Sequence, residues 1–433
     1  MRLKGLMEPL LENIQFQNTI KSIEDGKYPI EITGLSESGR AYFINGIYEQ
    51  EDKSIFIFTN SDVEAKNLYE DLSLYVPNVY YFPNKEVVFY NVYAISGDLR
   101  WERLKVIREM LKRGKKIIVA SIETLASTYI SPELYKKYTL KVAVGDVIDI
   151  EELSEKLIQG GYQRTSIVEG KGEFSIRGGI IDVYSPVSSV PYRIELFGDE
   201  VDSIRSFNTE SQRSIEKSKS IEIFPAKEMI LTKENIDMGY NSIKEDLQKA
   251  KERLVDDREL LDNLEKNTLS NLESLKETWS FENIDSFTPY FYEKTATLLD
   301  YMNNSLVFVT DIQRSLGKLD TVYFEFIENY KQLLERGTIL SKQLELLVPK
   351  EDILEKIQKS NIVTLNIISK EMDVLKSKHK ESFNQTILNS FGGKLDFLIE
   401  EINSKKSKGY KILILSGTRP RGERLVDALR DYD

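Results

Sequence analysis

Residues 34–41, Gly-Leu-Ser-Glu-Ser-Gly-Arg-Ala, keep the glycine spacing of a phosphate-binding loop, G-x-x-x-x-G-K-[ST]. An apolar run containing Ile30 and Ile32 precedes the loop, and a helical pattern follows it. This order of strand, glycine loop and helix is typical of an α/β lobe built on a parallel sheet. A G-x-x-x-x-G turn also arises by chance, so the interpretation depends on the rest of the chain.

The residues that perform chemistry in such a loop are missing. Arg40 stands where a lysine would reach the β- and γ-phosphates, and Ala41 stands where a hydroxyl would ligate Mg²⁺. Glu37 adds a negative charge to a loop that should accept an anion. Gly34, Gly39, Arg40 and Ala41 therefore predict a degenerate nucleotide loop with no bound metal, in a lobe that has kept its fold.

Composition limits the remaining possibilities. A length of 433 residues suggests about three domains. The absence of cysteine excludes disulfides and thiol catalysis, and the single histidine, His379, excludes a Ser-His-Asp triad. No apolar run reaches the roughly 18 residues of a membrane span, and no signal-peptide pattern begins the chain, so we expect a cytoplasmic protein without membrane contact. The net charge of -11 argues against a broad nucleic-acid surface.

The order of apolar patterns predicts several structural units. Residues 162–207 alternate between apolar and polar positions with glycine turns, which predicts an antiparallel meander. Helical periodicity over residues 241–280 predicts a helix pair, with a coiled coil as the alternative. Residues 412–429 repeat the strand–turn–helix pattern of residues 55–72. This repeat predicts a second α/β unit, although any strand–helix unit could produce it. The helical pattern stops at Asp433 without a cap, which suggests a piece of a longer protein.

Residues 172–186, Gly-Glu-Phe-Ser-Ile-Arg-Gly-Gly-Ile-Ile-Asp-Val-Tyr-Ser-Pro, resemble a signature shared by the bacterial excision-repair protein UvrB and the transcription-repair coupling factors. The tract at 192–207 and the preceding Gly161-Tyr162-Gln-Arg164 match both families too. The degenerate loop and the Ser211-Gln-Arg-Ser turn are closer to the coupling factors. The resemblance covers essentially the whole chain and implies an N-terminal fragment of that family.

A second degenerate motif supports the same resemblance. Asp311 and Ile312 follow an apolar strand where UvrB resembles an Asp-Glu-Ser helicase motif. A Walker B site needs one acid beside the metal and a second one to orient water, so isoleucine at the second position removes catalytic capacity.

The resemblance implies a degenerate RecA/helicase-like P-loop lobe with an inserted α+β module, followed by a second, smaller α/β domain. The expected boundaries are 1–127 and 214–346 for the two parts of the lobe, 128–213 for the UvrA-binding module, and 347–433 for the small domain. The polymerase-interacting domain and the translocase motor of the family would follow Asp433.

The resemblance also implies a function in transcription-coupled nucleotide excision repair. Members of the family displace stalled RNA polymerase by ATP-driven translocation and recruit the excision-repair machinery through UvrA. Carried onto this sequence, the UvrA contact falls on Arg164, Arg177 and Tyr184. The alternatives are a local ion pair for Arg177 and a core position for Tyr184. RNA polymerase would bind outside this chain, ATP and Mg²⁺ would act in the motor domains, and the lobe would bind DNA weakly.

Two other functions remain open. The chain could be a UvrB-like helicase or ATPase lobe that uses a variant loop with Arg40, since backbone N–H groups still point into such a loop. It could also be a DNA-binding module, with Trp101 and the basic residues around it as candidates. The stretch 89–96 is too short for UvrB's aromatic hairpin, which leaves Tyr90 and Tyr93 for packing.

Overall fold

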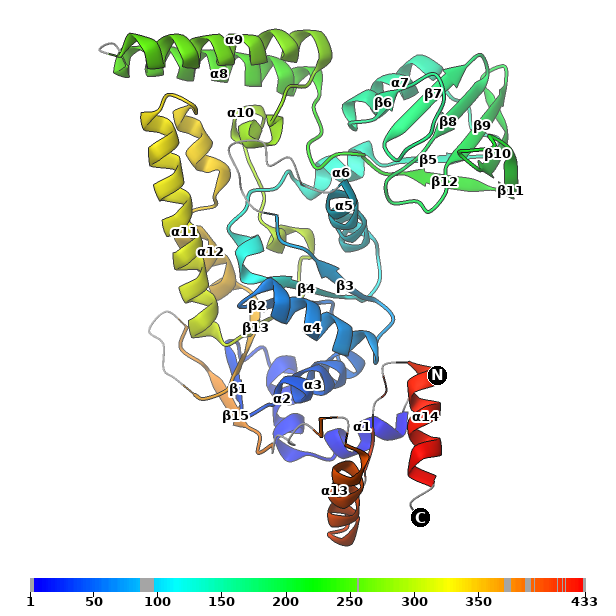
Figure 1. Cartoon of the computed structure of the whole chain (residues 1–433), viewed down its shortest axis with the longest axis vertical. Coiled ribbons are helices and arrows are strands. Elements are labelled where there is room, and N and C mark those ends of the chain that lie inside the picture. Colours follow the sequence, from blue (N-terminus) through cyan, green and yellow to red (C-terminus); the bar gives the residue numbers. More distant parts are fainter. Residues whose placement is uncertain are drawn as a thin grey trace.

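The structure is a computed structural model of the chain (Figure 1). The structure describes residues 4–85, 97–254, 257–369, 375–385, 391–392, 394–410, 412–414, 416 and 418–430. Tyr90 and Tyr93, which the sequence predicted to pack, lie outside these ranges.

A seven-stranded sheet forms the body of the lobe, and all of its strand pairs are parallel. Its order is β15-β1-β14-β13-β2-β4-β3. Every residue of β1, β2, β4 and β13 is buried, because helices cover both faces of the sheet. β2, β4 and β13 are mainly apolar, whereas β1 carries the buried Glu31 between Ile30 and Ile32. The strands are β1 (Ile30–Thr33), β2 (Ile55–Thr59), β3 (Val79–Phe82), β4 (Ile117–Ser121), β13 (Leu306–Thr310), β14 (Asn361–Asn366) and β15 (His379–Ser382).

Alternate residues of β2 point into two different cores, as the strand period requires. Ile55 and Ile57 pack in a cluster with Phe43 of α3, whereas Phe56 and Phe58 pack in the opposite cluster. The predicted α/β lobe is therefore confirmed. Its helices are α1 (Lys4–Leu11), α2 (Ile14–Glu24), α3 (Glu37–Gln50), α4 (Asp62–Ser73), α5 (Gly97–Leu111), α6 (Pro132–Tyr138), α11 (Ile312–Glu335) and α12 (Lys350–Lys359).

A second, six-stranded sheet lies at one side of the lobe, at the upper right of Figure 1. Its order is β11-β10-β9-β8-β7-β6, antiparallel except for the β6–β7 pair, which confirms the predicted meander. Helix α7 (Ile150–Gln159) and the pair β5 (Leu140–Ala143) and β12 (Ser220–Ile223) pack on it through one shared core. The strands are β6 (Gln163–Arg164), β7 (Glu173–Arg177), β8 (Ile180–Val183), β9 (Tyr192–Phe197), β10 (Glu200–Phe207) and β11 (Ser214–Ser218).

The expected boundaries of this module need correction. Tyr129 and Tyr135, inside the expected span 128–213, pack in the core of the lobe. In contrast, Ile221 and Ile223, beyond that span, pack in the core of the module. The unit therefore runs from about β5 to β12, because its sheet needs both of these strands to cover its inner face.

The expected start of a separate domain at residue 347 is also corrected. Strand β14 lies between β1 and β13 in the lobe sheet, and β15 pairs with β1 on the other side. Residues 412–414, expected as a strand, are outside any strand and their side chains are exposed. The helices that follow the lobe are α13 (Leu395–Ser407) and α14 (Arg419–Arg430), and α14 confirms the helical pattern read there.

Two long helices, α8 (Lys233–Arg253) and α9 (Arg258–Thr278), form the hairpin at the top of Figure 1. Ile243 and Leu275 pack with Phe291 of α10 (Thr288–Phe291) in one apolar cluster. The helix pair predicted from the sequence is confirmed, and its apolar face is covered by the 3₁₀ and α-helical turns that follow it.

A buried ion pair ties the module to the lobe. Arg103 of α5 is 2% exposed, and its guanidinium donates to both carboxylate oxygens of Glu228, at 2.8 and 3.1 Å. Tyr135 donates to the Glu228 carbonyl at 2.8 Å. Burial alone would raise the pKa of Glu228, but the charges of Arg103 and Lys85 lower it to about 2. The chain leaving the module is therefore held to the lobe at this point.

This junction should make stability depend on acid. The folded pKa of Glu228, about 2, lies below the ordinary 4.5, so its contribution is present above pH 4.5 and is lost as pH falls towards 2. The full contribution is on the order of 3 kcal/mol. We expect Glu228→Gln to lower the unfolding free energy at pH 6 and to differ less from the native chain at pH 3. A pH-independent difference in denaturant unfolding would contradict this account.

Candidate functional site

The degenerate loop has the local geometry of the motif that it resembles. Gly34, with φ of 78°, turns the chain out of β1. Ser36 then caps α3, and its hydroxyl accepts from the Gly39 N–H at 3.1 Å. The loop thus lies at the carboxyl end of a parallel strand, where ligands bind in open α/β sheets.

Arg40 does not point out of the loop towards a ligand. Its side chain is 5% exposed, and its guanidinium forms ion pairs with Glu64 of α4 at 2.9 Å and with Asp311 at 3.0 Å. Thr310 donates to the same Glu64 oxygen at 3.0 Å. Arg40, at the lysine position, therefore neutralises Asp311, at the Walker B acid position. These ion pairs hold β13, α4 and the loop together.

The other two degenerate positions are part of the core. Ala41 is 1% exposed and packs in the cluster between α3 and the sheet. Ile312 is 5% exposed and packs in the cluster on the opposite face. Neither position presents a polar atom of its side chain to the loop.

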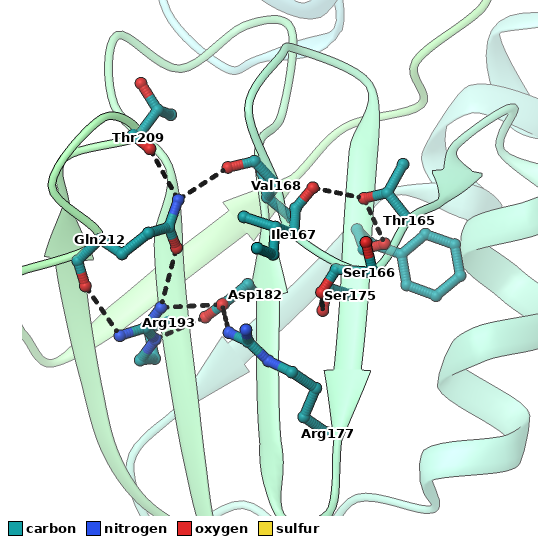
Figure 2. Close-up of polar contacts among 11 residues, drawn as sticks. Thr165, Ser166, Ile167, Val168, Ser175, Arg177, Asp182, Arg193, Thr209 and Gln212 are labelled. Atoms are coloured by element: carbon teal, nitrogen blue, oxygen red, sulfur yellow. Dashed lines mark hydrogen bonds and ion pairs between the residues drawn. The ribbon is translucent and has the colours of Figure 1, made fainter.

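The module carries a buried charge cluster on the outer face of its sheet (Figure 2). The Asp182 side chain is fully buried and accepts from Arg193 at 2.7 and 2.9 Å. Arg177 adds a third contact to Asp182 at 2.5 Å. Arg193 also donates to the Gln212 carbonyl at 3.2 Å, and the Gln212 amide donates to the Val168 carbonyl at 3.2 Å. These hydrogen bonds hold the loops that contain Val168 and Gln212 against this face of the sheet.

The three residues expected to contact UvrA do not form one cluster. Arg177 has the local ion pair left open as the alternative, yet 45% of its side chain stays exposed. Arg164 is exposed on edge strand β6, and its register with Phe174 directs it to the opposite face of the sheet from Arg177. Tyr184 follows the other end of β8, is half-buried, and donates to the Ser189 carbonyl at 3.1 Å.

The chain is similar to known proteins both over the module and over nearly its whole length. Residues 140–229 match the family model described as the UvrB interaction domain. Over 98% of its length the chain is similar to the transcription-repair-coupling factor of Bacillus subtilis, at 31% identity. The chain is homologous to one part of a transcription-repair-coupling factor. The corresponding proteins of Staphylococcus haemolyticus and Staphylococcus epidermidis are 28% and 27% identical over the same share. The chain spans 36% of the length of each of these coupling factors.

The matched span of this coupling-factor homologue agrees with the module boundaries seen in the fold. It begins at β5 and extends past β12, beyond the end at residue 213 that the sequence suggested. None of the described helices is long and apolar enough to cross a membrane.

Three residues of the coupling-factor homologue's module were not anticipated from the sequence. Arg193 pairs with Asp182 in the charge cluster, Gln212 accepts from Arg193 through its carbonyl, and Phe197 is 85% exposed beside the Gly198-Asp199 turn. An aromatic residue directly before a Gly-Asp turn is the signal that could have identified Phe197, because turn positions lie on the surface. Nothing local distinguishes Arg193 from the other arginines of the meander.

The basic residues considered for DNA contact separate into two groups. Arg103 is buried against Glu228 and is not available. Arg100 and Trp101 line a cleft of about 560 Å³ between the lobe and the module, together with Lys171 and Lys227. The Lys171 ammonium lies 5.3 Å from the Trp101 ring centre.

Proposed function

We propose that this chain is the part of a transcription-coupled repair factor that docks UvrA and does not hydrolyse nucleotide. The observation that carries the proposal is the module at residues 140–229, which matches the UvrB interaction domain and has a sheet and core of its own. The names of the coupling-factor relatives support the assignment to repair.

The two arginines proposed to dock UvrA, Arg164 and Arg177, differ in whether their side chains already pair with another residue of the chain. The Arg164 side chain is exposed and makes no hydrogen bond or ion pair within the part of the chain that the structure describes, so its guanidinium is free to pair with an acidic group. Arg177 is held by Asp182 while part of its side chain stays exposed, which reduces the entropy lost on binding. Arginine suits this role because it buries a large area and pairs with carboxylates through two parallel hydrogen bonds.

Arg164→Ala should weaken UvrA binding by about thirtyfold, since loss of a hot-spot arginine costs roughly 2 kcal/mol. The melting temperature should not change, because the residue is exposed. Lys217→Ala is the matched control, since it removes one exposed charge from β11 at the other edge of the same sheet. Binding and melting should be measured on the same samples. Unchanged affinity would place the interface elsewhere, and a parallel loss of stability would make Arg164 structural.

The lobe is proposed as a scaffold that holds the module. The Arg40 ion pair with Asp311 supports this proposal, because a carboxylate that is paired with a guanidinium is not available to bind Mg²⁺. ATP, Mg²⁺, translocation and RNA polymerase binding would belong to parts of the coupling factor that this chain does not cover. The cleft with Arg100 and Lys171 would account for weak, salt-sensitive DNA binding.

We expect no ATP turnover by this chain, with or without DNA. The physical reason is that Ala41 offers no hydroxyl for Mg²⁺ and Ile312 offers no acid to orient water. Titration calorimetry with Mg-ATP and a phosphate-release assay check this. Stoichiometric binding accompanied by turnover would favour the alternative, a variant ATPase lobe.

A further inference from the structure

The space in front of the degenerate loop is occupied by the chain itself. Phe383–Gln385, here called the plug segment, directly follows β15. The Phe383 N–H donates to the Thr33 carbonyl at 2.9 Å. The side-chain oxygen of Gln385 accepts from the Ser36 N–H at 2.9 Å and from the Ser36 hydroxyl at 3.0 Å.

Both glycines of the loop face the plug segment. A Cβ atom at Gly39 would lie 2.0 Å from the Gln385 side-chain oxygen, and one at Gly34 would lie 1.9 Å from the Phe383 carbonyl oxygen. In a working phosphate loop the glycines let a ligand oxygen approach the backbone. Here they admit two oxygens of the same polypeptide, at the amino end of α3, where a negative partial charge is stabilised.

The charge of the loop favours a neutral acceptor. Glu37, Glu64 and Asp311 carry negative charge, and only Arg40 among the loop and its ion-paired partners carries positive charge. A phosphate would add further negative charge to this set, whereas a carboxamide adds an acceptor oxygen without a net charge. Apolar packing supports the same contact, because the Phe383 ring lies 5.3 Å from the Phe43 ring in an edge-on arrangement.

We propose that the degenerate phosphate loop is a binding socket for the chain's own residues 383–385, in which the Gln385 carboxamide oxygen takes the place of a phosphate oxygen. The contact fixes where the chain leaves the lobe sheet after β15, on the way to α13. The loop has thus exchanged a diffusible ligand for an intramolecular one. This role does not depend on whether the module binds UvrA.

Gly39→Ala tests the socket without disturbing the lobe core. The added methyl group meets the end of a flexible side chain and should displace Gln385 from Ser36. Hydrogen exchange followed by mass spectrometry should show about tenfold faster exchange of the Ser36 and Phe383 amides. Gly317→Ala is the matched control, since Gly317 also lies in a helix and its Cβ would meet nothing within 4 Å. Equal exchange in both variants would overturn the proposal.

A double-mutant cycle makes the test specific to the proposed partner. Gln385→Ala removes the atom that the Gly39 Cβ would meet, and it should by itself accelerate exchange at Ser36. Because both substitutions break the same contact, adding Gly39→Ala to Gln385→Ala should change exchange no further. Additive effects of the two substitutions would show that Gly39 and Gln385 act independently and that the socket is not formed in solution.

Discussion

Arg40→Ala is expected to destabilise the lobe by about 3 kcal/mol or more, because it leaves the Glu64 and Asp311 carboxylates largely buried without a counter-charge. Arg40→Lys should recover part of the loss, since an ammonium keeps the charge but cannot reach both acids as the guanidinium fork does. Denaturant unfolding of the whole chain measures the effect.

The control for Arg40 is Arg113→Ala, which removes an exposed arginine from the same lobe and should change stability by less than about 0.5 kcal/mol. If Arg40→Ala instead left stability unchanged and abolished ATP binding, Arg40 would be a ligand-binding residue. The variant ATPase lobe would then be the better description of this region.

Asp182→Ala should have a similarly large effect in the module, about 3–5 kcal/mol. Asp182 is fully buried, and its removal leaves Arg193, whose side chain is 15% exposed, without its ionic partner. Hydrogen exchange at the amides of β8 and β9 should accelerate strongly, while the lobe strands should keep their protection. A guanidinium keeps its proton in proteins, so Arg193 stays charged after Asp182 is removed and cannot relieve the loss by releasing a proton.

Asp202→Ala is the matched control for Asp182, because Asp202 lies in β10 of the same sheet and is exposed. Its removal should leave exchange in β8 and β9 unchanged. Equal effects of the two substitutions would mean that the buried cluster contributes little. Arg177 would then be able to leave Asp182 and bind a partner without destabilising the module.

Replacing Arg177 should separate UvrA affinity from the stability of the module. It shares Asp182 with Arg193, which contacts both carboxylate oxygens, so Arg177→Ala should cost the module little stability. A loss of UvrA affinity in that variant would therefore report docking. Arg164 and Arg177 direct their side chains to opposite faces of the sheet. A partner that contacts both must wrap around the β6 edge.

The local sequence determined the elements. Unbroken apolar runs predicted the buried parallel strands, and alternation predicted the meander, because the number of covered faces sets the apolar pattern of a strand. Glycine spacing predicted the strand–loop–helix turn at Gly34, since that turn requires a positive φ. The identities of Arg40, Ala41 and Ile312 show that the lysine, the hydroxyl and the second acid of a working site are missing, because this depends only on the chemistry of the side chains.

Only the tertiary structure decided the partners of these elements. Strand β14 inserts between β1 and β13, although it comes later in the chain than both. Arg40 pairs with Asp311 over 271 positions, and Ser36 contacts Gln385 over 349. Periodicity records which face of an element is buried but not which element covers it, and a charged side chain pairs with whichever acid the folded chain brings within reach. The socket and the buried cluster at Asp182 are for that reason properties of the assembled sheets.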